Sequence, residues 1–210
     1  MTDIDLVLWD IGQVLYQSPF ERFGELEEHT GMAQGTLPRG FFAPGGDPQW
    51  DAVDRGELDE PEYWREIEAT CRRNVPGLHL YDALRELGWD GRGRPVVLAL
   101  MSDIASRYRQ AVLTNDATKF LGVGWKDGWE YADHFERIVD SLDIGLRKPD
   151  PRAYQAAVAS LGLDAGHVLF IDDLEVNVIG ARAAGLQGFR FDTTDPAASV
   201  AALRGLLGLA

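Results

Sequence analysis

Short apolar runs alternate with helical patterns over most of the chain, and this alternation constrains the fold more than any other feature. Five runs rich in Val, Ile, Leu and Phe end at polar or glycine residues, which is typical of buried strands: residues 4–9, 110–114, 137–140, 167–171 and 187–191. Amphipathic stretches that predict helices separate them: residues 95–108, 151–161, 174–184 and 196–207. The pattern therefore predicts an α/β fold, a doubly wound parallel sheet with helices on both faces.

Residues 18–88 interrupt this alternation, because they contain helical patterns only. Asp-Pro pairs are typical of helix starts and glycines of helix stops, and both occur here: Asp47-Pro48, Asp59-Glu60-Pro61, Gly31 and Gly56. About four helices fit. We therefore expect a helical domain of the four-helix-bundle type, residues 18–88, inserted into a core made of residues 1–17 and 89–210. Its position after the first strand predicts a lid over that strand's end, with Gly91 and Gly93 as a hinge.

The net charge of −14 limits the partners that this surface can attract. It repels nucleic acid and anionic membranes, so we expect neither as a partner. A phosphorylated substrate would be repelled as well, so a local positive cluster would have to offset the overall charge. Cys71 is the only cysteine, no basic n-region precedes the first apolar residues, and no apolar run approaches about 18 residues. We expect a cytoplasmic protein, monomeric or homodimeric.

Polar side chains follow the predicted strands at the ends where parallel sheets bind ligands. Asp10 follows the first strand, Thr114 ends the second, Lys148 comes after the third, and Asp172-Asp173 end the fourth. Singly, each is commonly a turn or helix-cap residue. Together they place three carboxylates, a hydroxyl and a lysine at one sheet edge. Close carboxylates repel one another unless a cation compensates, and hard oxygen ligands of this kind suit Mg²⁺.

The same positions resemble the four motifs of the haloacid dehalogenase-like superfamily, in family order across nearly the whole chain. The matching segments are residues 8–15 (LWDIGQVL), 113–115 (LTN), 145–151 (GLRKPDP) and 170–174 (FIDDL), the last followed by Asn177, Gly180, Ala181 and Gly185. Residues 54–58 (DRGEL) resemble the family's small helical cap. The resemblance implies a Rossmann-like core with a helical cap. Among subgroups, the chain is most similar to bacterial sugar-phosphate phosphatases of the alpha-glucose-1-phosphatase kind.

The resemblance also implies an activity, a metal and a role for each residue. The activity is hydrolysis of a small phosphate ester, in which Asp10 takes the phosphoryl group as an aspartyl-phosphate. Thr114 would donate a hydrogen bond to a phosphate oxygen, and Lys148 would neutralise the charge of phosphate and Asp10. The residues expected to bind the phosphate are Asn115, Gly12 and Arg147. The expected Mg²⁺ ligands are Asp10, the Gly12 backbone carbonyl and Asp173, and Asp172 would bind through water or orient the other ligands.

Gly12 departs from the pattern of most phosphatases in this family, which have an Asp at this position to protonate the leaving oxygen. Such acid–base help is worth roughly 10²–10⁴-fold in rate. Three explanations stay open: Asp116 or Asp47 supplies the proton, the leaving group needs little protonation, or the chain is a non-catalytic or weakly active phosphate-binding protein. A haloacid dehalogenase also lacks this acid, but it needs no metal, so the Asp172-Asp173 pair argues against that alternative. The missing acid argues against a phosphomutase.

Overall fold

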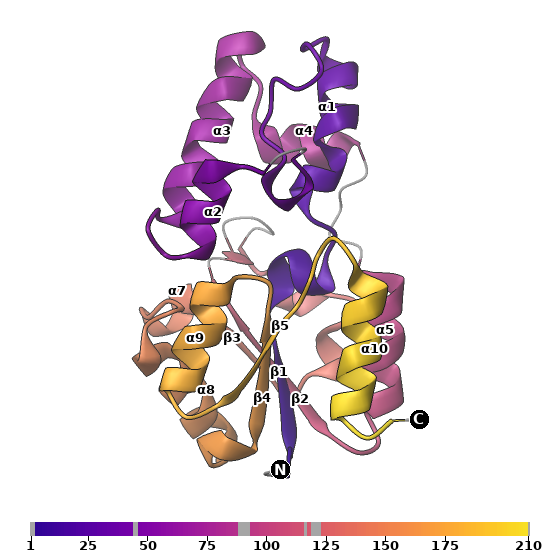
Figure 1. Cartoon of the computed structure of the whole chain (residues 1–210), viewed down its shortest axis with the longest axis vertical. Helices are drawn as coiled ribbons and strands as arrows, with labels where there is room; N and C mark the ends of the chain where they lie inside the picture. The colour runs from indigo at the N-terminus through magenta and orange to yellow at the C-terminus, as the bar shows by residue number, and fades with distance from the viewer. Residues whose placement is uncertain (1–2, 44–45, 88–92, 116, 119–122, 210) are drawn as a thin grey trace. The chain divides into compact units, whose positions relative to one another are not determined.

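The computed structural model describes residues 3–43, 46–87, 93–115, 117–118 and 123–209. The chain divides into two compact units (Figure 1): unit 1 comprises Met1–Tyr16 and Gly93–Ala210, and unit 2 comprises Gln17–Arg92. The expected first boundary, after residue 17, differs from this division by one residue. The expected return to the core, at residue 89, and the expected hinge residue Gly91 lie outside the described residues.

Unit 1 contains a five-stranded, entirely parallel sheet with the strand order β3-β2-β1-β4-β5. The strands are β1 (Leu6–Trp9), β2 (Arg109–Thr114), β3 (Arg137–Asp140), β4 (Val168–Asp172) and β5 (Gln187–Arg190). Each coincides with a predicted strand to within two residues at either end. The chain builds one side of the sheet outward from β1 and then returns to place β4 on the other side, so the switch point lies between β1 and β4.

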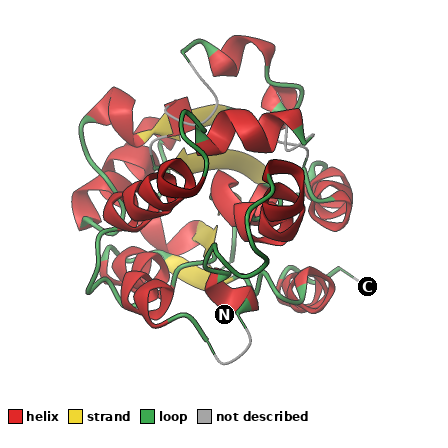
Figure 2. Ribbon diagram, turned by 90° about the horizontal axis from the view of Figure 1, so that it is seen from above, coloured by secondary structure: helices red, strands yellow, loops and turns green. Residues whose placement is uncertain are grey.

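Both faces of the sheet are buried, which explains why its strands are continuous apolar runs. Val7 and Trp9 of β1 belong to a core formed with two helices, whereas Leu6 and Leu8 point to the opposite face and pack on two others. The first pair of helices is α5 (Pro95–Ile104) and α10 (Pro196–Leu206), and the second is α8 (Pro151–Leu161) and α9 (Glu175–Ala183). Figure 1 shows these pairs on the two sides of the sheet, and Figure 2 shows its strands in yellow among them. The predicted doubly wound α/β core is confirmed.

The strand register brings the first and fourth predicted motifs side by side. Trp9 lies opposite Ile171 of β4, and the backbone N–H of Asp10 donates to the Ile171 carbonyl at 2.9 Å. Asp10 therefore leaves β1 beside Asp172, the last residue of β4. On the far side of β1, Thr114 ends β2 opposite Asp140 of β3. The short helix α7 (Ser141–Ile144) follows β3, and Asp140 caps it by accepting from the Leu142 N–H at 3.1 Å.

The described residues of unit 2 form helices joined by turns and loops, with no strand among them. Its α-helices are α1 (Phe23–Thr30), α2 (Pro48–Asp54), α3 (Glu60–Asn74) and α4 (Leu80–Glu86), with short 3₁₀ turns at Pro19–Arg22 and Gly40–Phe42. Five aromatic side chains form its centre: Phe20, Phe23, Trp50, Tyr63 and Trp64. Phe20 stacks on Trp64 with ring centroids 5.1 Å apart. The structure describes no helix that is long and apolar enough to cross a membrane.

Asp47, one of the two acids considered as a replacement at position 12, is a structural residue of unit 2. Its buried carboxylate caps α2 by accepting from the N–H groups of Gln49 and Trp50 at 3.1 and 3.2 Å. It also accepts from the Tyr63 hydroxyl at 2.7 Å. Burial, followed by the bond to Asp47, raises the pKa of Tyr63 above its ordinary value. These contacts give Asp47 a structural role within unit 2. The other candidate, Asp116, lies outside the described residues.

Candidate active site

Three carboxylates meet at the carboxyl edge of the sheet in unit 1. Asp10 follows β1, and Asp172 and Asp173 lie at the end of β4; one oxygen from each lies within 4.8 Å of the others. All three residues are buried, with Asp172 fully so. The structure thus brings together the acidic residues that the sequence singled out.

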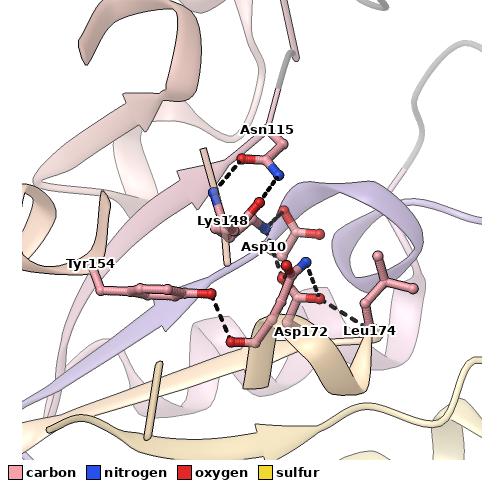
Figure 3. Close-up of polar contacts among 7 residues, drawn as sticks. Asp10, Asn115, Lys148, Tyr154, Asp172 and Leu174 are labelled. Atoms are coloured by element: carbon pink, nitrogen blue, oxygen red, sulfur yellow. Dashed lines mark hydrogen bonds and ion pairs between the residues drawn. The ribbon is translucent and has the colours of Figure 1, made fainter. Parts of the chain in front are cut away.

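Lys148 lies between two of these carboxylates (Figure 3). Its Nζ is 2.7 Å from Asp10 Oδ1 and 2.7 Å from Asp172 Oδ2, and its side chain is 1% exposed. Burial acts to lower the pKa of the Lys148 ammonium, but the two carboxylates outweigh it and raise that pKa above its ordinary value. Lys148 therefore stays charged, and it places one positive charge between these two carboxylates.

Two of the three carboxylates, Asp10 and Asp172, share Lys148 as an ion-pair partner. Burial raises the pKa of Asp10 to about 7; Lys148 acts against this rise, and Asp172 adds to it. A cation bound beside Asp10 would lower this pKa and favour the ionised carboxylate. The chemistry of the cluster, buried carboxylate oxygens close together, fits a hard cation such as Mg²⁺.

Asp172 is occupied by donors from its own unit. Its Oδ1 accepts from the Leu174 N–H at 2.9 Å and its Oδ2 from Lys148, while the Asn177 Nδ2 lies 3.1 and 3.2 Å from the two oxygens. A direct metal bond would displace one of these contacts. Neither of the two roles predicted for Asp172 needs such a bond, so binding of the metal through water and orientation of the other ligands both stay predictions.

The side-chain amide of Asn115 pairs with the main chain of Lys148 rather than with the acidic cluster. Its Nδ2 donates to the Lys148 carbonyl and its Oδ1 accepts from the Lys148 N–H, both at 3.0 Å. Thr114 is buried at the end of β2, and Arg147 is half-buried in the turn that carries Lys148. That Thr114, Asn115 and Arg147 contact phosphate stays a prediction.

Gly12 lies in the turn Ile11–Leu15 that follows Asp10, in a conformation open to any residue. Its φ and ψ are −59° and 130°, and a Cβ built on it would meet only Asp10 Oδ2, at 3.8 Å. The positive φ of this turn, 58°, falls on Gln13 instead, and Arg94 Nε donates to the Gln13 carbonyl at 3.2 Å. Neither backbone strain nor lack of space therefore requires glycine at position 12.

Sequence reasoning missed Tyr154 and gave Asn177 no role beyond its place in a motif. The Tyr154 hydroxyl, on α8, donates to the Asn177 carbonyl, on α9, at 2.7 Å. Asn177 in turn reaches both oxygens of Asp172. A polar residue five positions after a strand-end Asp, at the start of a helix, was the available signal for Asn177. No local pattern separates Tyr154 from an ordinary core tyrosine.

Gly180 of α9 packs against the residue that follows Lys148. A Cβ at this position would lie 2.6 Å from the Pro149 carbonyl oxygen and 3.1 Å from its Cα, so Gly180→Ala must push the turn away from the helix. We expect a loss of roughly 1–3 kcal/mol in unfolding free energy, measured by urea titration, together with reduced activity. Gly205→Ala in α10, where nothing lies within 4 Å, is the control and should be neutral or stabilising. Wild-type stability of Gly180→Ala would contradict this packing.

Comparison with known proteins relates the chain to one family of hydrolases. Residues 4–185 match the family model described as a haloacid dehalogenase-like hydrolase. The chain is 28% identical over 212 residues to acyl-CoA dehydrogenase family member 10 of Mus musculus; the match covers 96% of this chain but only 19% of that protein. It is 27% identical over 175 residues to the sesquiterpene phosphatase astK of Aspergillus oryzae, covering 76% of this chain and 79% of that protein.

Solved structures with similar folds include two hydrolases of this kind. The putative HAD-hydrolase YfnB of Bacillus subtilis, bound to magnesium, has a TM-score of 0.64 at 16% identity, covering 99% of this chain and all of that one. The L-2-haloacid dehalogenase RSc1362 has a TM-score of 0.63 at 21% identity, covering 91% of this chain and 87% of that one. At these identities the likeness shows the shared fold.

Proposed function

Because the chain belongs to the haloacid dehalogenase-like hydrolase family, we propose that it is a Mg²⁺-dependent phosphatase of a small phosphorylated metabolite, such as a sugar phosphate. The observation that carries the proposal is the buried Lys148 ammonium, 2.7 Å from both Asp10 and Asp172 within a cluster of three carboxylates. A phosphatase among the relatives adds support. A cytoplasmic location and a monomeric or homodimeric state stay predictions.

Each residue of the cluster would have a separate role in phosphoryl transfer. Asp10 would attack phosphorus with a carboxylate oxygen and form an aspartyl-phosphate, while the bond between phosphorus and the ester oxygen breaks and the leaving group departs as an alkoxide or phenolate. Water would then hydrolyse the aspartyl-phosphate to inorganic phosphate and the free carboxylate. Lys148 would hold Asp10 Oδ1 and offset the charge of the incoming phosphate. Thr114 would donate its hydroxyl to a phosphate oxygen. Asp10, Asp173 and the Gly12 carbonyl would hold Mg²⁺, whose positive charge lets the anionic carboxylate and phosphate approach each other.

Two alternatives have specific observations behind them. A haloacid dehalogenase is favoured by the fold likeness to one such enzyme and by Gly12, but that chemistry gives no reason for three clustered carboxylates. A non-catalytic phosphate-binding protein is favoured by Gly12 alone. The buried pair of Asp10 and Lys148 favours catalysis over it, because simple binding of an anion gains nothing from a carboxylate facing that anion.

Substrate preference tests the proposal, because Gly12 provides no acid to protonate the leaving group. Aryl phosphates leave as weakly basic phenolates and need little protonation, whereas primary alkyl phosphates leave as strongly basic alkoxides. We therefore expect phosphate release, and no halide release from 2-haloacids, with aryl phosphates and sugar 1-phosphates faster than sugar 6-phosphates. A single-turnover series of esters with graded leaving-group pKa measures this. A flat dependence with chemistry rate-limiting would mean that another residue supplies the proton, and halide release would favour the dehalogenase.

Gly12→Asp is the companion variant in the same series. Because the backbone at position 12 accepts any residue and the nearest heavy atom is 3.8 Å from the built Cβ, we expect this variant to fold normally. A carboxyl group there should speed release of the poorest leaving groups by roughly 10²-fold and change aryl phosphates little. Gly12→Asn is the matched control, since it adds similar bulk without an acid.

A further inference from the structure

The position of the Lys148 ammonium must be set by neighbouring residues. A lysine ammonium is a point charge on a flexible four-carbon stem, with no geometric preference of its own. Its two ion-pair partners are Asp10, which changes its contacts whenever it reacts, and Asp172. Because Asp10 cannot hold Lys148 in one place throughout the reaction, we look for groups that hold Lys148 and do not themselves react.

Asn115 holds the main chain of Lys148. Its planar amide binds the N–H and the carbonyl of the same residue, each at 3.0 Å (Figure 3). This reciprocal pair resembles the contact between neighbouring strands and fixes the Lys148 backbone against the end of β2. Thr114, the residue before Asn115, is thereby fixed relative to Lys148.

Asn177 holds the other end of Lys148 indirectly, through Asp172. Its Nδ2 reaches both Asp172 oxygens, and the Leu174 N–H takes Oδ1, so that Oδ2 faces the ammonium. Asn177 is buried, and the Tyr154 hydroxyl binds its carbonyl at 2.7 Å. The orientation of Asp172 is thus tied to two helices, α8 and α9.

We propose that Asn115 and Asn177 are positioning residues that hold Lys148 from opposite ends, the first at its main chain and the second through the Asp172 carboxylate. The effect on turnover rests on the proposed function, because it assumes that Lys148 serves phosphoryl transfer. The effect on the position of Lys148 does not depend on that function.

A double-mutant cycle separates positioning from direct contact with phosphate. With p-nitrophenyl phosphate and Mg²⁺, we expect Asn115→Ala to lower kcat roughly tenfold with little change in KM, and Lys148→Ala to lower kcat further. If Asn115 acts through Lys148, the double variant will be no slower than Lys148→Ala. Asn177→Ala should behave in the same way. Effects that multiply in the double variants would overturn the proposal in favour of separate contacts with the substrate.

The chain has three asparagines, and the matched control is the same change at the remaining one, Asn74→Ala. Asn74 is exposed in unit 2, and among the contacts described its side chain bonds only to its own helix. It should keep wild-type kcat. Thermal unfolding shows whether each variant is folded. If Asn115→Ala is unfolded, the near-isosteric Asn115→Asp replaces it. That variant keeps the acceptor for the Lys148 N–H but sets an oxygen against the Lys148 carbonyl, so the same non-additive loss is expected.

Nitrogen-15 NMR of the lysine ammonium groups tests the proposal without any turnover. The chain has only three lysines, Lys119, Lys126 and Lys148, so the Lys148 signal is identified by its loss in Lys148→Ala. Asn115→Ala and Asn177→Ala should each shift or broaden it, whereas the Lys126 signal, from a group paired with Asp143 near the surface, should stay in place. An unmoved Lys148 signal in folded Asn variants would overturn the proposal. If the wild type released no phosphate, the proposed function would fail while this spectrum still decided the positioning role.

Discussion

Asp10→Asn is expected to abolish phosphate release, lowering kcat by roughly 10⁴-fold or more. The amide has nearly the shape of the carboxylate but cannot form the aspartyl-phosphate, and it no longer offers a charge to Lys148, 2.7 Å away in the wild type. The fold should persist, because Lys148 keeps its second partner, Asp172. Phosphate release from activated and unactivated esters, with thermal unfolding of the same preparation, measures both effects.

The metal-free Asp10→Asn protein should also resist unfolding better than the wild type above neutral pH. The pKa of Asp10 is raised from 3.8 to about 7, so the folded state binds more protons than the unfolded state across that window. The contribution of Asp10 to stability therefore falls as pH rises from about 4 to about 7, whereas Asn does not titrate.

Asp143→Asn, the same change at an exposed carboxylate paired with Lys126, is the control for activity. Near-normal phosphate release from folded Asp10→Asn would contradict the nucleophile assignment.

Removal of Mg²⁺ by a chelator is expected to reduce phosphate release to background, and added Mg²⁺ should restore it. Three buried carboxylates lie close together, and groups of this charge repel one another and an incoming phosphate ester unless cations compensate. Ca²⁺ should inhibit, because its larger and looser coordination would misplace Asp10. Mg²⁺ should also raise the unfolding temperature of the protein, since a cation held by the folded cluster stabilises it.

Asp173→Asn separates this metal requirement from a general need for ionic strength. We expect the variant to require a higher Mg²⁺ concentration for half-maximal activity. NaCl at the same ionic strength should not restore its activity. Full activity of the wild type in excess chelator would contradict the metal site and return the dehalogenase to first place.

The strands and helices of unit 1 could be predicted from the sequence because each carries its own local signal. Buried parallel strands are continuous apolar runs, and α8 begins at Pro151 and stops at Gly162, a residue with φ of 65°. The same reasoning predicted that Asp10 and Asp172 lie close together, since parallel strands end at one edge of the sheet. Predicted strands differed from the observed ones by one or two residues at some ends, where pairing with a neighbour sets the limit.

The contacts that arrange the site could not be predicted, because they depend on distances across the fold. Nothing local indicates that Asn115 pairs with Lys148, or that Tyr154 binds the carbonyl of Asn177. The same holds for Asp47, where an Asp before Pro predicted the helix cap but not the bond from Tyr63. Local chemistry identified the candidates, and the topology decided which of them meet.

The most direct test of the account is to look for the phosphoryl group on Asp10. The protein is mixed with Mg²⁺ and p-nitrophenyl phosphate, quenched in acid within one turnover, and its peptides are analysed by mass spectrometry. We predict that the peptide containing Asp10 gains one phosphoryl group, that borohydride reduces this residue, and that the group is absent without Mg²⁺. Release of phosphate at the full rate while Asp10 stays unmodified, or phosphoryl transfer to another residue, would contradict the account.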